Sequence, residues 1–489
     1  MHKLSKKTYE TEDYTMECSY DPSPVKKQLK IKRLSLKRNV KEIILPESID
    51  NMSVTGIKLY KAKPRKRNEP LYICDRLVLP SMLRSMDNGA FEGSNAFNEV
   101  YIPKNITVIP AFCFCTASIK KVTFEDESVI TDIENHAFAG SKIKEFHWPS
   151  NCKIINNHCF EDSTLEEITG IDNVTVIEWE AFSNTHLKTF VWPKMCLRIP
   201  AYCFRNSKQL SSVSGIENVT EIGIGAFAGT QNLKETFAWP NKCKIIDEDT
   251  FYASAISGIT GIEDVVEIRM RAFSATYNLT GEFLWPPQCT SISHSTFNGS
   301  AISSISGIEN VLDIDKGAFA ATSNMKGIFH WPSKCTVIRS AMFYGSAISG
   351  ISGIENVGSI KASAFAETSN LTGEFLWPKN CTVIDEETFY GSAITSISGI
   401  EAVTAIHYHA FAKSALNNID LGENLRYISL FAFVKDENME GFSLNTDINF
   451  EDCEEFTIDT TGYYANRSEA LEFFMKKVHL PFDIEVNVK

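Results

Sequence analysis

A phenylalanine, often preceded by alanine, recurs at a nearly constant interval along most of the chain. The interval is 22 to 24 residues and is kept through sixteen positions. These are Phe91, Phe114, Phe138, Phe160, Phe182, Phe204, Phe227, Phe251, Phe273, Phe297, Phe319, Phe343, Phe365, Phe389, Phe411 and Phe433. Self-similarity at a fixed period of this length is typical of a solenoid, in which each coil contacts only its neighbours. The pattern therefore predicts a repeat array over residues 80–436.

The repeat units alternate between two kinds. One carries the motif Trp-Pro-x-x-Cys, beginning at Trp148, Trp192, Trp239, Trp285, Trp331 and Trp377. The other carries Gly-Ile-(Glu/Asp)-x-Val, beginning at Gly170, Gly215, Gly261, Gly307, Gly353 and Gly399. Each motif recurs about every 46 residues, so the duplicated block is a pair of coils.

One coil shows how the pattern builds a core. Phe190 and Trp192 are two residues apart, so they share one face of a short strand. Pro193 ends that strand because it has no N–H to donate. Cys196 then turns inward, and Phe204 fills the opposite side of the core. No coil can bury these groups alone, and stacking buries them.

The same alternation predicts which side chains point outward from the strands. On the Trp-Pro-x-x-Cys coils they are His147, Val191, Ala238, Leu284, His330 and Leu376. On the other coils they are Thr169, Ser214, Thr260, Ser306, Ser352 and Ser398. Lys and Glu are nearly absent from this strip of side chains. Because depletion of charged residues is typical of the core of a protein interface, the strip is the candidate protein-binding surface. The alternative is a regular sheet face that carries β-forming residues and has no partner.

The consensus Leu-x-x-Ile-x-Ile-Pro-x-x-Val-x-x-Ile-x-x-x-Ala-Phe resembles the BspA-like, or treponemal-class, leucine-rich repeat, although this chain has Trp-Pro-x-x-Cys at the proline turn. The resemblance implies an α/β repeat solenoid. It implies a right-handed superhelix with a parallel β-sheet on the concave face, and short strands with short helical or irregular segments on the convex side. It also implies a surface-exposed or secreted protein that binds host, matrix or partner proteins, and no catalytic residues.

The two ends of the chain depart from the repeat. Residues 1–39 are expected to form a basic N-terminal segment, and 40–79 a degenerate cap repeat with a basic loop insertion at Lys61, Lys63, Arg65, Lys66 and Arg67. That loop is either a localisation-like or phosphate-binding patch or a solvated surface insertion. Residues 437–489 are expected to form a C-terminal cap with a helix near 467–478.

Charge, cysteine spacing and the absence of catalytic motifs argue against several classes of function. The net charge of −13 argues against nucleic-acid binding by the whole chain, although residues 1–70 carry an excess of positive charge. The thirteen cysteines include six at one coil position, two coils apart, which is too far for a disulfide. The chain has no Cys-x-x-Cys motif for a zinc site, and no histidine shows a carboxylate partner at a fixed spacing. With no phosphate loop or nucleophile motif either, we expect no metal, cofactor, small-molecule substrate or enzymatic activity.

These observations favour a non-catalytic protein-binding module whose ligand is unknown. The alternative is an intracellular scaffold or secreted effector targeted through its basic N-terminal segment. The family resemblance suggests the cell surface or secretion, whereas the first residues lack an ordinary secretory signal, which suggests an intracellular location or non-classical export. No run of eighteen apolar residues predicts a membrane span.

Overall fold

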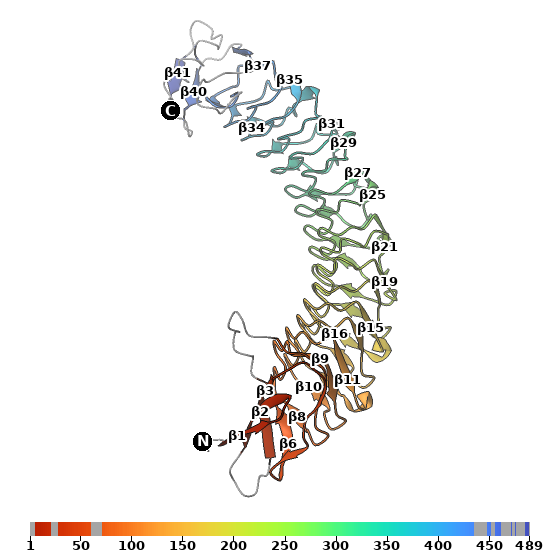
Figure 1. Cartoon of the computed structure of the whole chain (residues 1–489). Helices are drawn as coiled ribbons and strands as arrows, with labels where there is room; N and C mark the ends of the chain where they lie inside the picture. The colour runs from red at the N-terminus through yellow and green to blue at the C-terminus, as the bar shows by residue number, and fades with distance from the viewer. Residues whose placement is uncertain are drawn as a thin grey trace. The chain divides into compact units, whose positions relative to one another are not determined.

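The computed structural model describes residues 5–20, 28–59, 71–434, 447–450, 455–460, 471, 475 and 485–488. Over these residues the chain is a β-solenoid of the leucine-rich-repeat type, built from short strands joined by turns. It divides into two compact units, residues 1–235 with 240–243 and residues 236–239 with 244–489. Figure 1 shows the strands of each unit stacked as successive rungs.

The first unit begins with an antiparallel sheet. Strand β2 (Tyr14–Tyr20) pairs antiparallel with both β1 (Ser5–Glu10) and β3 (Gln28–Leu36). Strand β3 then pairs in parallel with β6 (Met52–Ile57), which also contacts β5 (Ser48–Ile49) and β8 (Ser85–Met86). Met16, Cys18, Leu29 and Ile31 are buried in this sheet. The basic N-terminal segment therefore packs onto the start of the array.

The first unit continues with one row of longer strands and one row of two-residue strands. The longer strands are β4 (Val40–Ile44), β7 (Cys74–Val78), β9 (Phe97–Ile102), β11 (Lys121–Phe124), β13 (Glu145–His147), β15 (Glu167–Thr169), β17 (Thr189–Val191) and β19 (Ser212–Ser214). The short strands are β10 (Val108–Ile109), β12 (Asp132–Ile133), β14 (Ile154–Ile155), β16 (Val176–Ile177), β18 (Arg198–Ile199) and β20 (Glu221–Ile222). Within each row, strands that pair with a neighbour do so in parallel.

The second unit has the same two rows. Its longer strands are β21 (Thr236–Ala238), β23 (Gly258–Thr260), β25 (Gly281–Leu284), β27 (Ile302–Ser306), β29 (Ile328–His330), β31 (Gly350–Ser352), β33 (Gly373–Leu376), β35 (Ile394–Ser398), β37 (Asn418–Leu421) and β39 (Asp447–Phe450). Its short strands are β22 (Ile245–Ile246), β24 (Glu267–Ile268), β26 (Ser291–Ile292), β28 (Asp313–Ile314), β30 (Val337–Ile338), β32 (Ser359–Ile360), β34 (Val383–Ile384), β36 (Ala405–Ile406) and β38 (Tyr427–Ser429). Strands β40 (Glu455–Asp459) and β41 (Glu485–Val488) extend the short row.

The repeat phenylalanines form a stack of parallel rings through the centre of each unit. From Phe91 to Phe227, successive ring centroids lie 5.3–5.9 Å apart. From Phe251 to Phe433 they lie 5.2–5.9 Å apart. All are fully buried, and offset ring stacking of this kind adds to the burial of apolar area. The repeating phenylalanine predicted from the sequence therefore supplies one core ring to each coil.

The segments around the core, expected to be short helical or irregular ones, contain almost no helix in the described residues. Within the described ranges, the helical segments are two 3-10 turns, η1 (Glu127–Val129) and η2 (Ile171–Asn173), with Leu471 and Met475 also helical. The remaining connections are turns. Their backbone enters the left-handed region two residues before the repeat phenylalanine, as at His136 (φ 56°) and Ala341 (φ 53°). A left-handed residue interrupts any right-handed helical run, so these coils close through turns.

Two expected features fall largely outside the described residues. The basic loop with Lys61, Lys63, Arg65, Lys66 and Arg67 lies outside them entirely. Of the expected helix near 467–478, only positions 471 and 475 are described, and both are helical. In the part of the chain that the structure describes, no helix is both long and apolar enough to cross a membrane.

Candidate interaction surface

Parallel pairing brings the two predicted outward rows side by side. Each Trp-Pro-x-x-Cys strand pairs with the strand of the following coil, and the two outward residues are direct partners in register. The pairs are His147 with Thr169, Val191 with Ser214, Ala238 with Thr260, Leu284 with Ser306, His330 with Ser352 and Leu376 with Ser398. We call this set of twelve residues the strand-row surface. It is present in both units.

Large apolar side chains of the strand-row surface are exposed. Val191 is 67% exposed, Leu284 64% and Leu376 65%. In contrast, Phe283, directly before Leu284 on the same strand, points inward and is 4% exposed. Ile328 is also exposed, at 59%, and the sequence analysis missed it. It lies two residues before His330 on the same strand face, so extending the alternation by one step would have found it.

The hydroxyl row is fixed by a glycine turn that follows it. Gly307, directly after Ser306, has φ of 77°, and an added Cβ would lie 2.8 Å from the Trp285 carbonyl oxygen. The Trp285 backbone N–H donates to the Ser306 carbonyl over 2.8 Å. Only glycine allows both this left-handed backbone and this close approach. The turn therefore holds the end of one strand against the next.

The Trp-Pro-x-x-Cys motif is a hydrogen-bonded turn beneath this surface. The Trp285 indole Nε1–H donates to the Cys289 carbonyl over 3.0 Å, and the Cys289 N–H donates to the Pro286 carbonyl over 3.0 Å. The Cys289 thiol lies 3.4 Å from the Val265 carbonyl of the preceding coil. Burial raises the pKa of Cys289 to about 12, which keeps the thiol protonated and unreactive. All cysteines in the described part of the chain are free thiols.

Both histidines of the strand-row surface are held against the neighbouring strand. Nδ1 of His147 lies 2.9 Å from Oγ1 of Thr169, and Nδ1 of His330 lies 2.7 Å from Oγ of Ser352. Nε2 of His147 also lies 3.5 Å from a Glu127 carboxylate oxygen. These contacts orient both imidazoles on the strand face.

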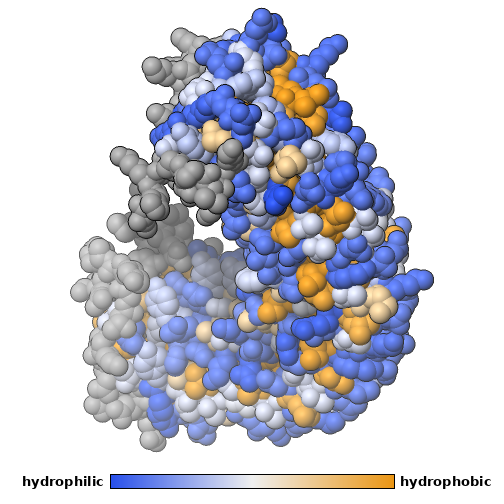
Figure 2. Space-filling view, turned by 90° about the horizontal axis from the view of Figure 1, so that it is seen from below, coloured by the Kyte–Doolittle hydropathy of each residue, from blue (hydrophilic) through white to orange (hydrophobic). Residues whose placement is uncertain are grey.

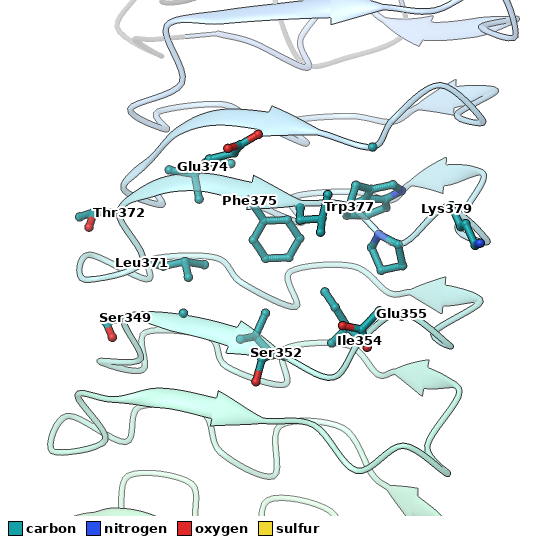
Figure 3. A pocket seen from close by; sticks show the side chains of 16 residues that line it. Ser349, Ser352, Ile354, Glu355, Leu371, Thr372, Glu374, Phe375, Trp377 and Lys379 are labelled. Atoms are coloured by element: carbon teal, nitrogen blue, oxygen red, sulfur yellow. The ribbon is translucent and has the colours of Figure 1, made fainter.

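Grooves separate the strand pairs. Strand β31 pairs with β29, and β33 pairs with β35, but no pairing joins β31 to β33 among the described strands. A cavity of about 510 Å³ occupies that gap, and Figure 3 shows Phe375 and Leu371 beside it. Equivalent cavities lie between β23 and β25, at about 270 Å³, and between β11 and β13, at about 360 Å³. The repeat period of the sequence does not predict these grooves.

The grooves combine an apolar wall with a charged rim. In the β31–β33 groove, Ile354, Phe375 and Trp377 contribute the wall. Its charged lining residues are two carboxylates, Glu355 and Glu374, and one lysine, Lys379 (Figure 3). Glu282 holds the same place as Glu374 in the β23–β25 groove. Such a groove can accept an apolar side chain of a partner and favours a positive charge beside it.

Figure 2 shows hydrophobic residues of one face as separate patches within a mostly hydrophilic surface. Separate small patches are normal for a soluble protein, and a large continuous one marks an interface. The strand-row surface differs from scattered exposure because its apolar residues recur at one structural position.

These features define the chain as a leucine-rich-repeat solenoid. The model of the BspA-type leucine-rich repeat region matches residues 72–178, 131–257, 244–372 and 372–459, so the chain belongs to this family. Repeats of this family are in general non-catalytic scaffolds, and the array is consistent with a protein-interaction module.

Among solved structures, one shows a likeness in fold and a second is matched with a lower score. A leucine-rich repeat protein from Bacteroides ovatus ATCC 8483 is 17% identical, with 98% of this chain and 99% of that chain covered and a TM-score of 0.52. A leucine-rich cell surface protein from Faecalibacterium prausnitzii A2-165 is 16% identical, with 83% and 95% covered and a TM-score of 0.39. The comparison with curated protein sequences gave no match.

Proposed function

We propose that this chain is a non-catalytic protein-binding module that binds its partner through the strand-row surface. The observation that carries the proposal is the exposure of Val191, Leu284 and Leu376 at one recurring position beside a hydroxyl row. Burying apolar area on a partner contributes about 25 cal/mol per Å². A row of such residues therefore supplies binding free energy along the array.

The grooves suggest how the side chains of a partner would be recognised. Each groove lies between unpaired strand edges and has room for a side chain, and the hydroxyl row supplies hydrogen-bond donors and acceptors beside it. A partner with apolar side chains flanked by basic residues fits the carboxylates Glu282, Glu355 and Glu374. Membership of the BspA-type family supports placing this binding at the cell surface or after secretion.

The experiment changes Leu284, His330 and Leu376 together to Glu and measures affinity for a partner isolated by pull-down with the intact chain. These side chains point away from the core, so the variant should fold. Carboxylates desolvated against a partner are costly, and hot-spot losses of 2 kcal/mol or more correspond to roughly 30-fold weaker binding. We expect at least that loss.

A matched control changes Tyr277, Leu312 and Tyr344 to Glu. These residues are also exposed and apolar, but none belongs to the strand-row surface. The control should keep full affinity. If the strand-row variant keeps its affinity, and a variant of the basic loop at Lys63, Arg65 and Arg67 loses it, the proposal is wrong and the loop is the binding element.

A further inference from the structure

Another surface of the first unit carries a column of residues that the proposed function does not use. The residue two positions before the repeat phenylalanine has a left-handed backbone in successive coils, with φ of 59° at Phe112, 56° at His136, 54° at His158 and 53° at Glu180. The shared conformation superimposes these side chains coil on coil. The ring centroids of Phe112 and His136 lie 4.6 Å apart, and those of His136 and His158 lie 4.3 Å apart.

Four potential metal ligands gather at the middle of this column. Nδ1 of His158 lies 2.9 Å from Oε2 of Glu161 and 3.4 Å from Oε2 of Glu180. Nδ1 of His136 lies 4.0 Å from the same Glu161 oxygen. Ligand atoms of His136, His158 and Glu161 all lie within 4.8 Å of one another. Three ligands from two successive coils therefore lie close together, and Glu180 of the next coil reaches His158.

We propose that His136, His158, Glu161 and Glu180 form a binding site for a divalent transition-metal ion of the Zn²⁺ type. Two imidazole nitrogens and two carboxylate oxygens are a donor set that such ions accept, and four ligands complete a tetrahedral site. Hard ions such as Ca²⁺ instead take six to eight oxygen ligands, which this cluster does not offer.

The electrostatics of the cluster favour a cation. The carboxylates of Glu161 and Glu180 both lie against His158, so two acidic groups share one confined volume. In the ion pairs of the described residues, both carboxylates meet only these imidazoles. A divalent ion would neutralise the pair.

Binding requires a local rearrangement. The rings of His136 and His158 are parallel to within 5°, and parallel rings cannot both aim a lone pair at one ion. Rotation of the rings about the Cβ–Cγ bond brings the nitrogens to a common point and breaks the stack. The four side chains are 15–28% exposed, so an ion can reach them without unfolding a coil.

The same column in the second unit lacks this combination. At this position the second unit has a single imidazole, beside one carboxylate in the preceding coil, and otherwise other charged or small residues: Asp249, Arg271, Ser295, Gly317, Ala341, Ser363, Glu387 and His409. The donor set therefore does not follow from the repeat itself.

The test is Zn²⁺ binding to the intact, reduced chain, measured by calorimetry at neutral pH. We expect one tight equivalent, lost in His158→Ala and weakened in Glu180→Gln by at least the 10- to 100-fold typical of a supporting residue. His294→Ala is the matched control, because that exposed imidazole lies outside both the cluster and the strand-row surface, and it should keep the equivalent. Circular dichroism confirms folding, and His136→Asn provides a second ligand variant.

Co²⁺ substitution identifies the ligands independently. Visible d–d bands without thiolate charge-transfer absorption support the imidazole and carboxylate set. Trp179, whose ring centroid lies 5.5 Å from that of His158, should show quenching by Co²⁺ that Trp179→Phe removes. Failure to bind one equivalent, binding unchanged in both His158→Ala and His136→Asn, or a thiolate band would each overturn the proposal. None of these outcomes bears on partner binding at the strand-row surface.

Discussion

The two units share a core but differ at the coil corners. In the first unit the corner column carries Phe112, His136 and His158 as stacked rings, whereas in the second it carries residues such as Arg271 and Ala341. The phenylalanine stacks beneath are nearly the same, with ring spacings of 5.3–5.9 Å and 5.2–5.9 Å. Core positions are therefore kept by packing, while corner positions are free to acquire chemistry.

The largest expected loss of stability comes from removing a core phenylalanine, and it should be equal in the two units. Phe160→Ala in the first and Phe319→Ala in the second each remove a fully buried ring from a stack, and each should cost about 3–5 kcal/mol. In an array in which coils contact only their neighbours, the damage should remain local. Hydrogen exchange should therefore rise first around residues 140–185 in one variant and 300–345 in the other.

Two outcomes would contradict this equality. A uniform rise in exchange across the unit would indicate one cooperative domain rather than separable coils. A much smaller cost for Phe160→Ala than for Phe319→Ala would mean that the corner rings compensate for a lost core ring in the first unit.

The core was predictable from the sequence because its signal repeats. Phe319 and Phe160 occupy one position of a 22- to 24-residue period, and the alternation of side chains predicts that Leu284 and Ser306 both point outward; their pairing in register is a finding of the structure. Helices were expected by family resemblance, and the left-handed residues at the corners exclude them. Those φ angles were not visible in the sequence.

The proposed metal cluster and the grooves escaped prediction for a different reason. His136, His158 and Glu180 are one coil apart, so no short motif joins them, and the carboxylate partner of His158 was missed although Glu161 is only three residues away. Aligning the units on their phenylalanines would have shown His, His and Glu in one column. The grooves depend on strands pairing two by two, and a regular period does not reveal which neighbours pair.

Loss of the indole hydrogen bond of the Trp-Pro-x-x-Cys turn should lower stability by a smaller amount, and equally in both units. Trp285→Phe removes the indole N–H and leaves the buried Cys289 carbonyl without that donor, at a cost of about 1–3 kcal/mol. Trp148→Phe in the first unit breaks the equivalent bond to Cys152 and should cost the same. Chemical denaturation followed by near-ultraviolet circular dichroism measures both.

The control is a tryptophan outside the motif. Trp179→Phe changes a half-exposed ring at a coil corner and should alter stability by no more than about 0.5 kcal/mol. A larger cost for Trp179→Phe than for Trp148→Phe would show that the corner column, rather than the Trp-Pro-x-x-Cys turn, stabilises the first unit.

The smallest effect should be confined to the first unit. Glu166 bridges three successive coils there, with its carboxylate oxygens 2.8 Å from Nζ of Lys144 and 2.7 Å from Nζ of Lys188. The equivalent position in a second-unit coil is Ser303, which has no charge to contribute. Glu166→Gln should therefore lower the thermal midpoint slightly, and Ser303→Gln should leave it unchanged.

The pH dependence separates this ion-pair effect from packing. The two lysines lower the pKa of Glu166 to about 2. A carboxyl whose folded pKa is depressed stabilises the protein above its ordinary pKa near 4.5 and loses that contribution as the pH falls towards 2. The difference between the native chain and Glu166→Gln should thus be present at pH 6, shrink below pH 4 and be reduced by salt, because exposed charges are screened. A difference that stays constant from pH 6 to pH 2, in low and high salt, would mean that Glu166 acts by packing and that charge adds nothing to the contrast between the units.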